Sequence, residues 1–156
     1  MASIVYELYG SNPVSMLTVT ELNALANGSG SVLGTEFDNS VASNWTRAQF
    51  EGVFDFGAAP TAGTTIDLYL VKALDGSNYE LYTSGASEVV QGATYLGSFE
   101  IPSATDPIRL SVRGVQGEWS EIPPCKFKLA VVNNSGQALH TSGSTVKMIL
   151  YRLKTA

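Results

Sequence analysis

The residues with the clearest capacity for chemistry are one cysteine and one histidine, the only ones in 156 residues. Cys125 follows two prolines, and His140 lies in the polar stretch "NNSGQALHTSGST" (133–145). Together they could form a nucleophile and its base, but no family-specific motif surrounds either one. A Ser–His–Asp site would also depend on His140, and the chain has no Gly-x-Ser-x-Gly elbow. We therefore expect Cys125 to be a small, part-buried residue and His140 to lie in a loop between strands.

Carboxylates are the second candidate chemistry, because paired Asp and Glu residues can hydrolyse glycosidic bonds. The acids near candidate strands alternate with apolar neighbours, so we expect them to face solvent, stay ionised and make poor general acids. One Cys and one His are too few for an ordinary zinc site, and "DGSNYE" is too short for an EF-hand. The sequence therefore predicts a protein that is not an enzyme and has no catalytic, cofactor-binding or metal-binding residues. The acids concerned are Glu51, Asp55, Asp67, Glu80 and Glu100.

Aromatic residues are better candidates, for interaction and not for catalysis. Trp119 is flanked by Glu118 and Glu121 in an expected loop, and tryptophan is enriched at interface hot spots. Capping the open end of the core and contacting a partner are equally open alternatives for this ring, and stacking on a sugar is a third. The candidate interaction residues are Tyr6, Tyr9, Trp45, Trp119 and Tyr151.

These side chains must be positioned by strands. Segments with period-two alternation recur between turn signals, and no helices are interposed, which predicts an all-β, antiparallel, jelly-roll-like sandwich. Residues 79–83 could add a short return strand. The segment 145–154 is apolar on both faces, so we expect it to be covered on both sides or to meet a neighbour. The expected strands are 31–40, 45–57, 65–74, 94–102, 107–115, 126–134 and 145–154.

One short N-terminal helix is expected before these strands. Thr18 and Glu21 have the spacing of a capping box, and Gly28 suits the residue after a helix, which predicts about two turns. Residues 1–17 lack strong periodicity and are expected to form an extended arm, followed by a single domain over 18–156. We expect residues 133–145 to connect two strands that pair antiparallel.

The net charge of the chain disfavours two classes of binding partner. The chain has 14 acidic and 9 basic residues, a net charge of −5 and a pI near 4.7. Nucleic acid and anionic membranes are therefore poor partners, since both require clustered Lys and Arg. The first residues lack a basic region, and no stretch is apolar enough to span a membrane, so we expect neither a signal peptide nor a membrane segment.

Four phrases of the chain resemble small virion proteins of tailed bacteriophages: "IDLYLVKALDGSNYE", "IRLSVRGV", "PPCKFKLAVVNNSGQAL" and "GSTVKMILYRLK". The likeness extends from about Thr18 onward, while "VQGEWSEIPP" departs from it as a longer loop. It implies a capsid decoration or cement protein that binds the major capsid protein and copies of itself as a homo-oligomer. Such a protein assembles in the host bacterial cytoplasm and resides on the virion surface, which agrees with the lack of disulfides.

Two rival functions remain. Trp45 and Trp119 also suit a receptor- or carbohydrate-binding module of a phage fibre or tail. An enzyme built on Cys125 and His140 is the third hypothesis.

Overall fold

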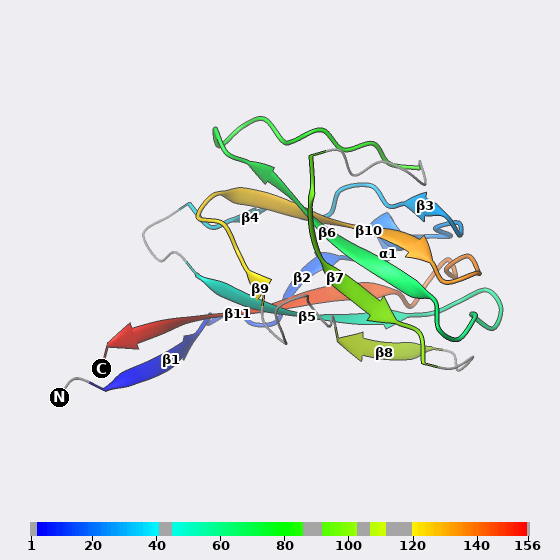
Figure 1. Ribbon diagram of the computed structural model, residues 1–156, viewed down its shortest axis with the longest axis horizontal. Coiled ribbons are helices and arrows are strands. Elements are labelled where there is room, and N and C mark those ends of the chain that lie inside the picture. The colour runs from blue at the N-terminus through cyan, green and yellow to red at the C-terminus, as the bar shows by residue number, and fades with distance from the viewer. Residues whose placement is uncertain (1–2, 41–44, 86–91, 103–106, 112–119, 156) are drawn as a thin grey trace.

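The computed structural model describes residues 3–40, 45–85, 92–102, 107–111 and 120–155 and contains two packed antiparallel sheets (Figure 1). The predicted all-β sandwich is confirmed. One sheet has the order β1-β11-β5-β8, with β2 also on β11 and β9 also on β5; the other has the order β3-β10-β6-β7, with β4 also on β10. The elements are β1 (Ile4–Leu8), β2 (Val14–Leu17), α1 (Val19–Leu22), β3 (Ser29–Gly30), β4 (Phe37–Asp38), β5 (Arg47–Phe54), β6 (Thr65–Ala73), β7 (Thr94–Glu100), β8 (Ile108–Ser111), β9 (Ser120–Glu121), β10 (Lys126–Asn134) and β11 (Thr145–Thr155).

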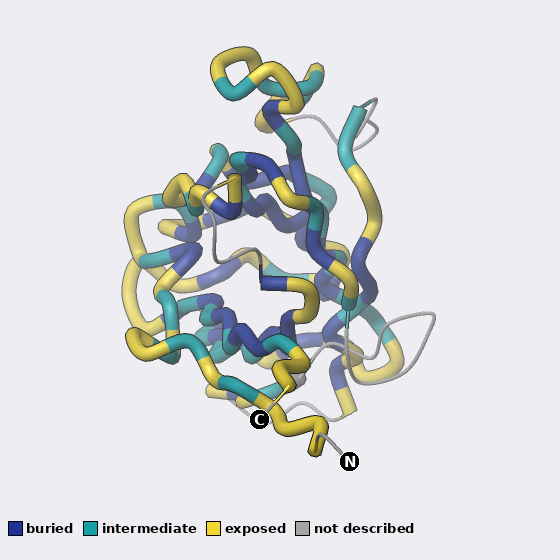
Figure 2. The backbone as a smooth tube through the Cα atoms, turned by 90° about the vertical axis from the view of Figure 1, so that its left-hand side faces the viewer, coloured by how far each residue is buried: buried dark blue, intermediate teal, exposed yellow. Residues whose placement is uncertain are grey.

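The core between the sheets consists of the alternating apolar residues that predicted the strands. β5 buries every second residue from Ala48 to Phe54, and β6, β10 and β11 bury their inward residues in the same way. Buried stretches alternate with intermediate and exposed ones along the backbone in Figure 2. Burying a large apolar side chain contributes about 1.5–3 kcal/mol, so this layer stabilises the fold. Side chains with almost no exposed surface include Met16, Leu17, Leu22, Phe50, Phe54, Phe99, Phe127 and Leu129.

The predicted helix is present but has a single turn. The Thr18 backbone N–H donates to Glu21 Oε2 at 2.7 Å and the Thr20 N–H donates to Thr18 Oγ1 at 3.2 Å, which forms the capping box. The helix ends at Leu22 because Asn23 already has an extended ψ of 118° and Ala24 a left-handed φ of 49°. The second turn predicted as far as Gly28 is therefore wrong.

Two predicted strands are largely replaced by irregular chain. Within 31–40 only β4 is a strand, and residues 79–83 form none. Instead, residues 74–85 lie across the outer face of the β3-β10-β6-β7 sheet, where the Tyr82 hydroxyl donates to the Ser31 carbonyl at 2.6 Å. This cover explains why Ala130 and Val132, which point away from the core, are buried.

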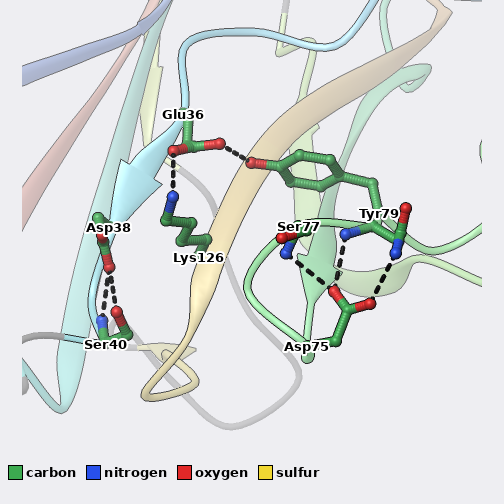
Figure 3. A network of polar contacts seen from close by, with 8 residues as sticks. Glu36, Asp38, Ser40, Asp75, Ser77, Tyr79 and Lys126 are labelled. Carbon is green, nitrogen blue, oxygen red and sulfur yellow. Dashed lines mark hydrogen bonds and ion pairs between the residues drawn. The ribbon is translucent and has the colours of Figure 1, made fainter.

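Polar contacts hold this covering segment in place (Figure 3). Lys126 Nζ lies 3.3 Å from Glu36 Oε1, and the Tyr79 hydroxyl donates to the other oxygen of the same carboxylate. Asp75 accepts hydrogen bonds from the backbone N–H groups of Ser77 and Asn78, which lower the pKa of its carboxyl to about 2. The segment is therefore an ordered turn followed by a polar attachment to β10.

The expected N-terminal arm lies in a sheet, and its two halves differ. β1 pairs with Tyr151–Thr155 of β11, whereas β2 pairs with the start of β11 and places Met16 and Leu17, both fully buried, in the core. Between them, the Asn12 side chain exchanges two hydrogen bonds of 2.9 Å with the backbone of Leu150, in place of a strand. The second half of the arm thus belongs to the sandwich, because it supplies core volume.

The stretch 133–145 does not join a hairpin, which corrects the expected pairing. β10 and β11 belong to different sheets, so the connection crosses the sandwich. Leu139 is buried and donates its N–H to the Leu25 carbonyl at 3.0 Å. The Asn133 side chain, also fully buried, donates to the carbonyls of Leu25 and Gln137 and accepts from Ser135. The loop is polar because its side chains form hydrogen bonds with the backbone and hydroxyl groups of the same end of the sandwich.

Candidate interaction surface

The feature that stands out from the sandwich is a two-stranded extension at the chain termini. β5 pairs with β11 only as far as Tyr151, whereas β1 continues along β11 to Thr155. The two strands project beyond the body, with both termini at their tip (Figure 1). We call residues Ile4–Leu8 and Tyr151–Thr155 the terminal ribbon.

One face of the terminal ribbon is apolar and exposed. Paired residues of antiparallel strands place their side chains on the same face, and the register pairs Tyr6 with Leu153 and Leu8 with Tyr151. The exposed fractions are 72% for Ile4, 74% for Tyr6, 63% for Leu8 and 52% for Leu153. Four large apolar side chains therefore lie in solvent side by side.

A buried tyrosine forms the base of this face. Tyr151 is only 3% exposed, and the ring of Tyr6 meets it edge to face at a centroid distance of 5.6 Å and an interplanar angle of 61°. Burial raises the pKa of the Tyr151 phenol, which stays protonated at neutral pH. Tyr151 thus supports Tyr6 from below, and Tyr6 is the ring that a partner would reach.

The opposite face of the terminal ribbon is charged and paired. Glu7 Oε2 accepts a hydrogen bond of 2.5 Å from Arg152 Nε, and Lys154 Nζ lies 3.3 Å from Glu7 Oε1. The hydrogen bond from Arg152, followed by that from Lys154, lowers the pKa of the Glu7 carboxyl. The Arg152 guanidinium also lies 4.9 Å from the centroid of the Trp45 ring. This face is the one suited to water.

An aromatic cluster anchors the terminal ribbon to the sandwich. The Tyr9 ring meets Trp45 at 5.3 Å and Phe37 at 5.7 Å, in both cases edge to face. Trp45 is buried, and the Asn39 side chain bonds both its backbone N–H, at 2.9 Å, and its carbonyl, at 2.8 Å. Such edge-to-face pairs each add about 0.5–1.5 kcal/mol. Trp45 therefore caps the end of the core.

The candidate interaction residues have different fates. Tyr6, Tyr9, Trp45 and Tyr151 all lie in or beside the terminal ribbon, and of these four residues Tyr6 is the one whose side chain is mostly exposed. Trp119 lies outside the described residues. The sequence reasoning missed Ile4, Leu8 and Leu153, although the alternation in "IVYEL" was the available signal.

The histidine loop lacks the arrangement of a triad. His140 Nδ1 lies 3.9 Å from Asp55 Oδ2 and 3.2 Å from Ser142 Oγ, so the acid and the hydroxyl share one ring nitrogen. A serine nucleophile must instead meet Nε2 while the acid holds Nδ1. Gly143 keeps a left-handed φ of 89° close against Asp55, which leaves no room for a side chain. The contacts of His140 with Asp55 and Ser142 therefore belong to a turn and do not have the geometry of a catalytic triad.

Cys125 and His140 cannot form a catalytic pair. Cys125 precedes the first residue of β10, whereas the histidine follows its last residue, so a nine-residue strand separates them by about 25–30 Å. Burial raises the pKa of the Cys125 thiol, which disfavours a thiolate. The two side chains therefore do not come together as a nucleophile and its base in the described chain.

A second exposed cluster lies on the outer face of the other sheet. The rings of Tyr69 and Tyr95 are 5.5 Å apart, and Tyr95 is 44% exposed. Beside them, Asp67 accepts hydrogen bonds from Ser98 at 2.6 Å and Asn134 at 3.0 Å. Tyrosine rings next to an acid and an amide are groups that a sugar could contact.

Other kinds of site are not found in the part of the chain that is described. No group of three or more His, Cys, Asp or Glu residues there is placed to hold a metal ion. Likewise, none of its helices has the length and apolar character needed to cross a membrane. No family model, curated protein or solved structure matches the chain.

Proposed function

We propose that this protein is a structural component of a tailed-phage virion, which decorates the capsid by binding the major capsid protein lattice in many copies. The observation that carries the proposal is the terminal ribbon, an exposed apolar surface suited to the protein–protein contacts of a component that assembles in many copies. A surface of this kind favours contact with protein, because burying exposed apolar side chains drives association.

Three further features support this role. The four sequence phrases that resemble phage virion proteins include β6, β8, β10 and β11, which form most of the sandwich. The net charge of −5 disfavours contact with packaged DNA and suits the outer surface of a capsid. A decoration protein also acts in many copies, so avidity multiplies weak contacts.

Co-sedimentation tests the proposal. Capsids of the encoding phage, prepared without this protein, are mixed with the full chain and pelleted. We expect saturable binding at a fixed ratio of chain to capsid protein, and cryo-electron microscopy should show regular density on the outer surface. An absence of pelleted protein at all concentrations would contradict the proposal.

A receptor- or carbohydrate-binding role is the second candidate, and the Tyr69–Tyr95 pair with Asp67 now supports it in place of Trp45, which is buried. A glycan array with the full chain tests it. Loss of any observed binding on Tyr95→Ala, but not on Tyr79→Ala, would favour this role, and an array without signal would remove it.

A further inference from the structure

We propose that the apolar face of the terminal ribbon binds the same face of a second copy of this chain, about a two-fold axis that passes near Tyr6. The inference rests on the proposed function only for the assembly in which the contact would occur. It assigns a second copy of this chain as the partner at this surface. It makes the terminal ribbon a self-association device, and it leaves contact with the capsid to another part of the molecule.

The apolar face of the terminal ribbon lacks a cover within the described chain. Tyr6 and Ile4 are each more than 70% exposed, although isolated two-stranded ribbons are only marginally stable in water. Strands gain stability from a third strand or from packing of the apolar face. A second copy of the terminal ribbon, stacked face to face, supplies such packing at the spacing of a sandwich, about 10 Å.

The order of side chains on this face is what points to a second copy. Along β1 it presents Ile4, Tyr6 and Leu8, an aromatic ring between two aliphatic side chains of similar volume, so the order is nearly the same in both directions. An antiparallel second copy would place Ile4 of one chain over Leu8 of the other, and Tyr6 over Tyr6. This is the self-complementarity that a two-fold, isologous contact requires.

Charge also favours this face over the other surfaces of the terminal ribbon. Ile4, Tyr6, Leu8 and Leu153 carry no charge, and the nearest cation on this face, Arg47, borders it at Tyr151, so two copies of a chain with net charge −5 can meet at Tyr6 without opposed charges. The free edge of β11 would bring Arg152 and Lys154 of two copies together, and like charges directly opposite are destabilising. The remaining outer face of this sheet is charged, since it carries Arg47 and Lys147 as well as the ion pair of Glu51 with Arg109.

The expected dimer is weak. Four side chains from each copy make a small contact, below the roughly 1,200 Å² at which stable interfaces begin. We therefore expect a dissociation constant on the order of micromolar and an exchange that depends on concentration. In a multivalent assembly such a contact is sufficient, since each neighbour adds to the avidity.

Sedimentation velocity of the full chain across a wide concentration range tests the proposal. We expect a monomer–dimer equilibrium for the natural chain and at least about tenfold weaker dimerisation for Tyr6→Glu, which places two negative charges near the axis. The matched control is Val5→Glu: it adds the same charge to the same strand, but on the opposite face and across from Lys154, and should change dimerisation by less than about twofold. Leu153→Glu, on the other strand of the apolar face, should act like Tyr6→Glu.

Circular dichroism checks that each variant is folded. If Tyr6→Glu does not fold, Leu153→Glu tests the same apolar face. A natural chain that stays monomeric at all concentrations would overturn the inference. So would equal weakening by Val5→Glu and Tyr6→Glu, or growth into open-ended polymers instead of dimers. Capsid sedimentation separates the two proposals: a dimer that does not bind capsids overturns the proposed function alone, and a strictly monomeric chain that binds them overturns the inference alone.

Discussion

The terminal ribbon and the loop 133–145 lie at the two ends of β11 and reverse the usual relation between composition and exposure. The loop is polar, yet Asn133 and Ser135 are fully buried and bonded to their surroundings. One face of the terminal ribbon is apolar, yet Ile4 and Tyr6 on that face lie in solvent. Polar residues therefore form part of the interior of this fold, apolar residues form part of its accessible surface, and substitutions in the two regions can test that contrast.

The largest expected effect separates the two halves of the N-terminal segment. Leu17→Ala should lower the free energy of unfolding by about 2–5 kcal/mol, because Leu17 is fully buried and its loss leaves a cavity. The matched variant Leu8→Ala removes the same atoms from a side chain that is 63% exposed, and should cost less than about 0.5 kcal/mol. Urea denaturation at a concentration where the chain is monomeric measures both. Equal losses would mean that the terminal ribbon belongs to the folding core.

The next effect concerns the loop. Asn133→Ala should cost about 2–4 kcal/mol, since it leaves the buried carbonyls of Leu25 and Gln137 and the Ser135 hydroxyl without that amide. The neighbouring Asn134→Ala is the control: its exposed amide bonds only Asp67, and its loss should cost less than about 0.5 kcal/mol. Thermal or urea unfolding checks the pair. If the two variants were alike, the loop would be an ordinary solvated turn.

A change of pH should loosen the terminal ribbon and spare the loop. The folded-state pKa of Glu7 is depressed, so its ion pairs stabilise the terminal ribbon above the unfolded value near 4.5 and are lost as pH falls through the lower folded value. Hydrogen exchange, corrected for its intrinsic pH dependence, should accelerate in β1 between pH 6 and pH 3, but not at the neutral amide bonds of Asn133. The terminal ribbon of Glu7→Gln should already exchange fast at pH 6. Unchanged exchange in that variant would show that the ion pairs contribute nothing.

The sequence was sufficient for the layers of the fold, since alternation such as Phe127, Leu129 and Val131 directly reports which residues face a core. It was insufficient for pairing. A ten-residue connection from Asn134 to Thr145 is compatible with a hairpin, but burial of Leu139 between the sheets takes it across the sandwich. Such a choice depends on contacts far apart in sequence, which local patterns do not contain.

The candidate surface was predicted only in part, again because exposure depends on contacts between strands that are distant in sequence. Aromatic side chains identified its neighbourhood, because Tyr6 and Tyr151 lie on strands that pair. The exposure of each tyrosine depends on where β5 stops pairing with β11. The residues at the end of β5 decide that point, and the sequences of β1 and β11 do not contain it. Leu153 lies on the same outer face of β11 as Tyr151, which is buried, and its position beyond that limit leaves it 52% exposed.

The smallest expected effect is at the residue that first suggested chemistry. His140→Ala should change the free energy of unfolding by less than about 0.5 kcal/mol, because its ring is half exposed and its separation of 3.9 Å from Asp55 is a weak surface ion pair. Ser144→Ala, in the same loop, should cost about 1–2 kcal/mol, since the buried Ser144 hydroxyl bonds both the backbone N–H and the carbonyl of Asp55. Urea denaturation of both variants measures the two losses in free energy of unfolding. A histidine variant that is the more damaging of the two would mean that the imidazole, and not the backbone around it, organises this end of the sandwich, and the contrast with the terminal ribbon would no longer hold.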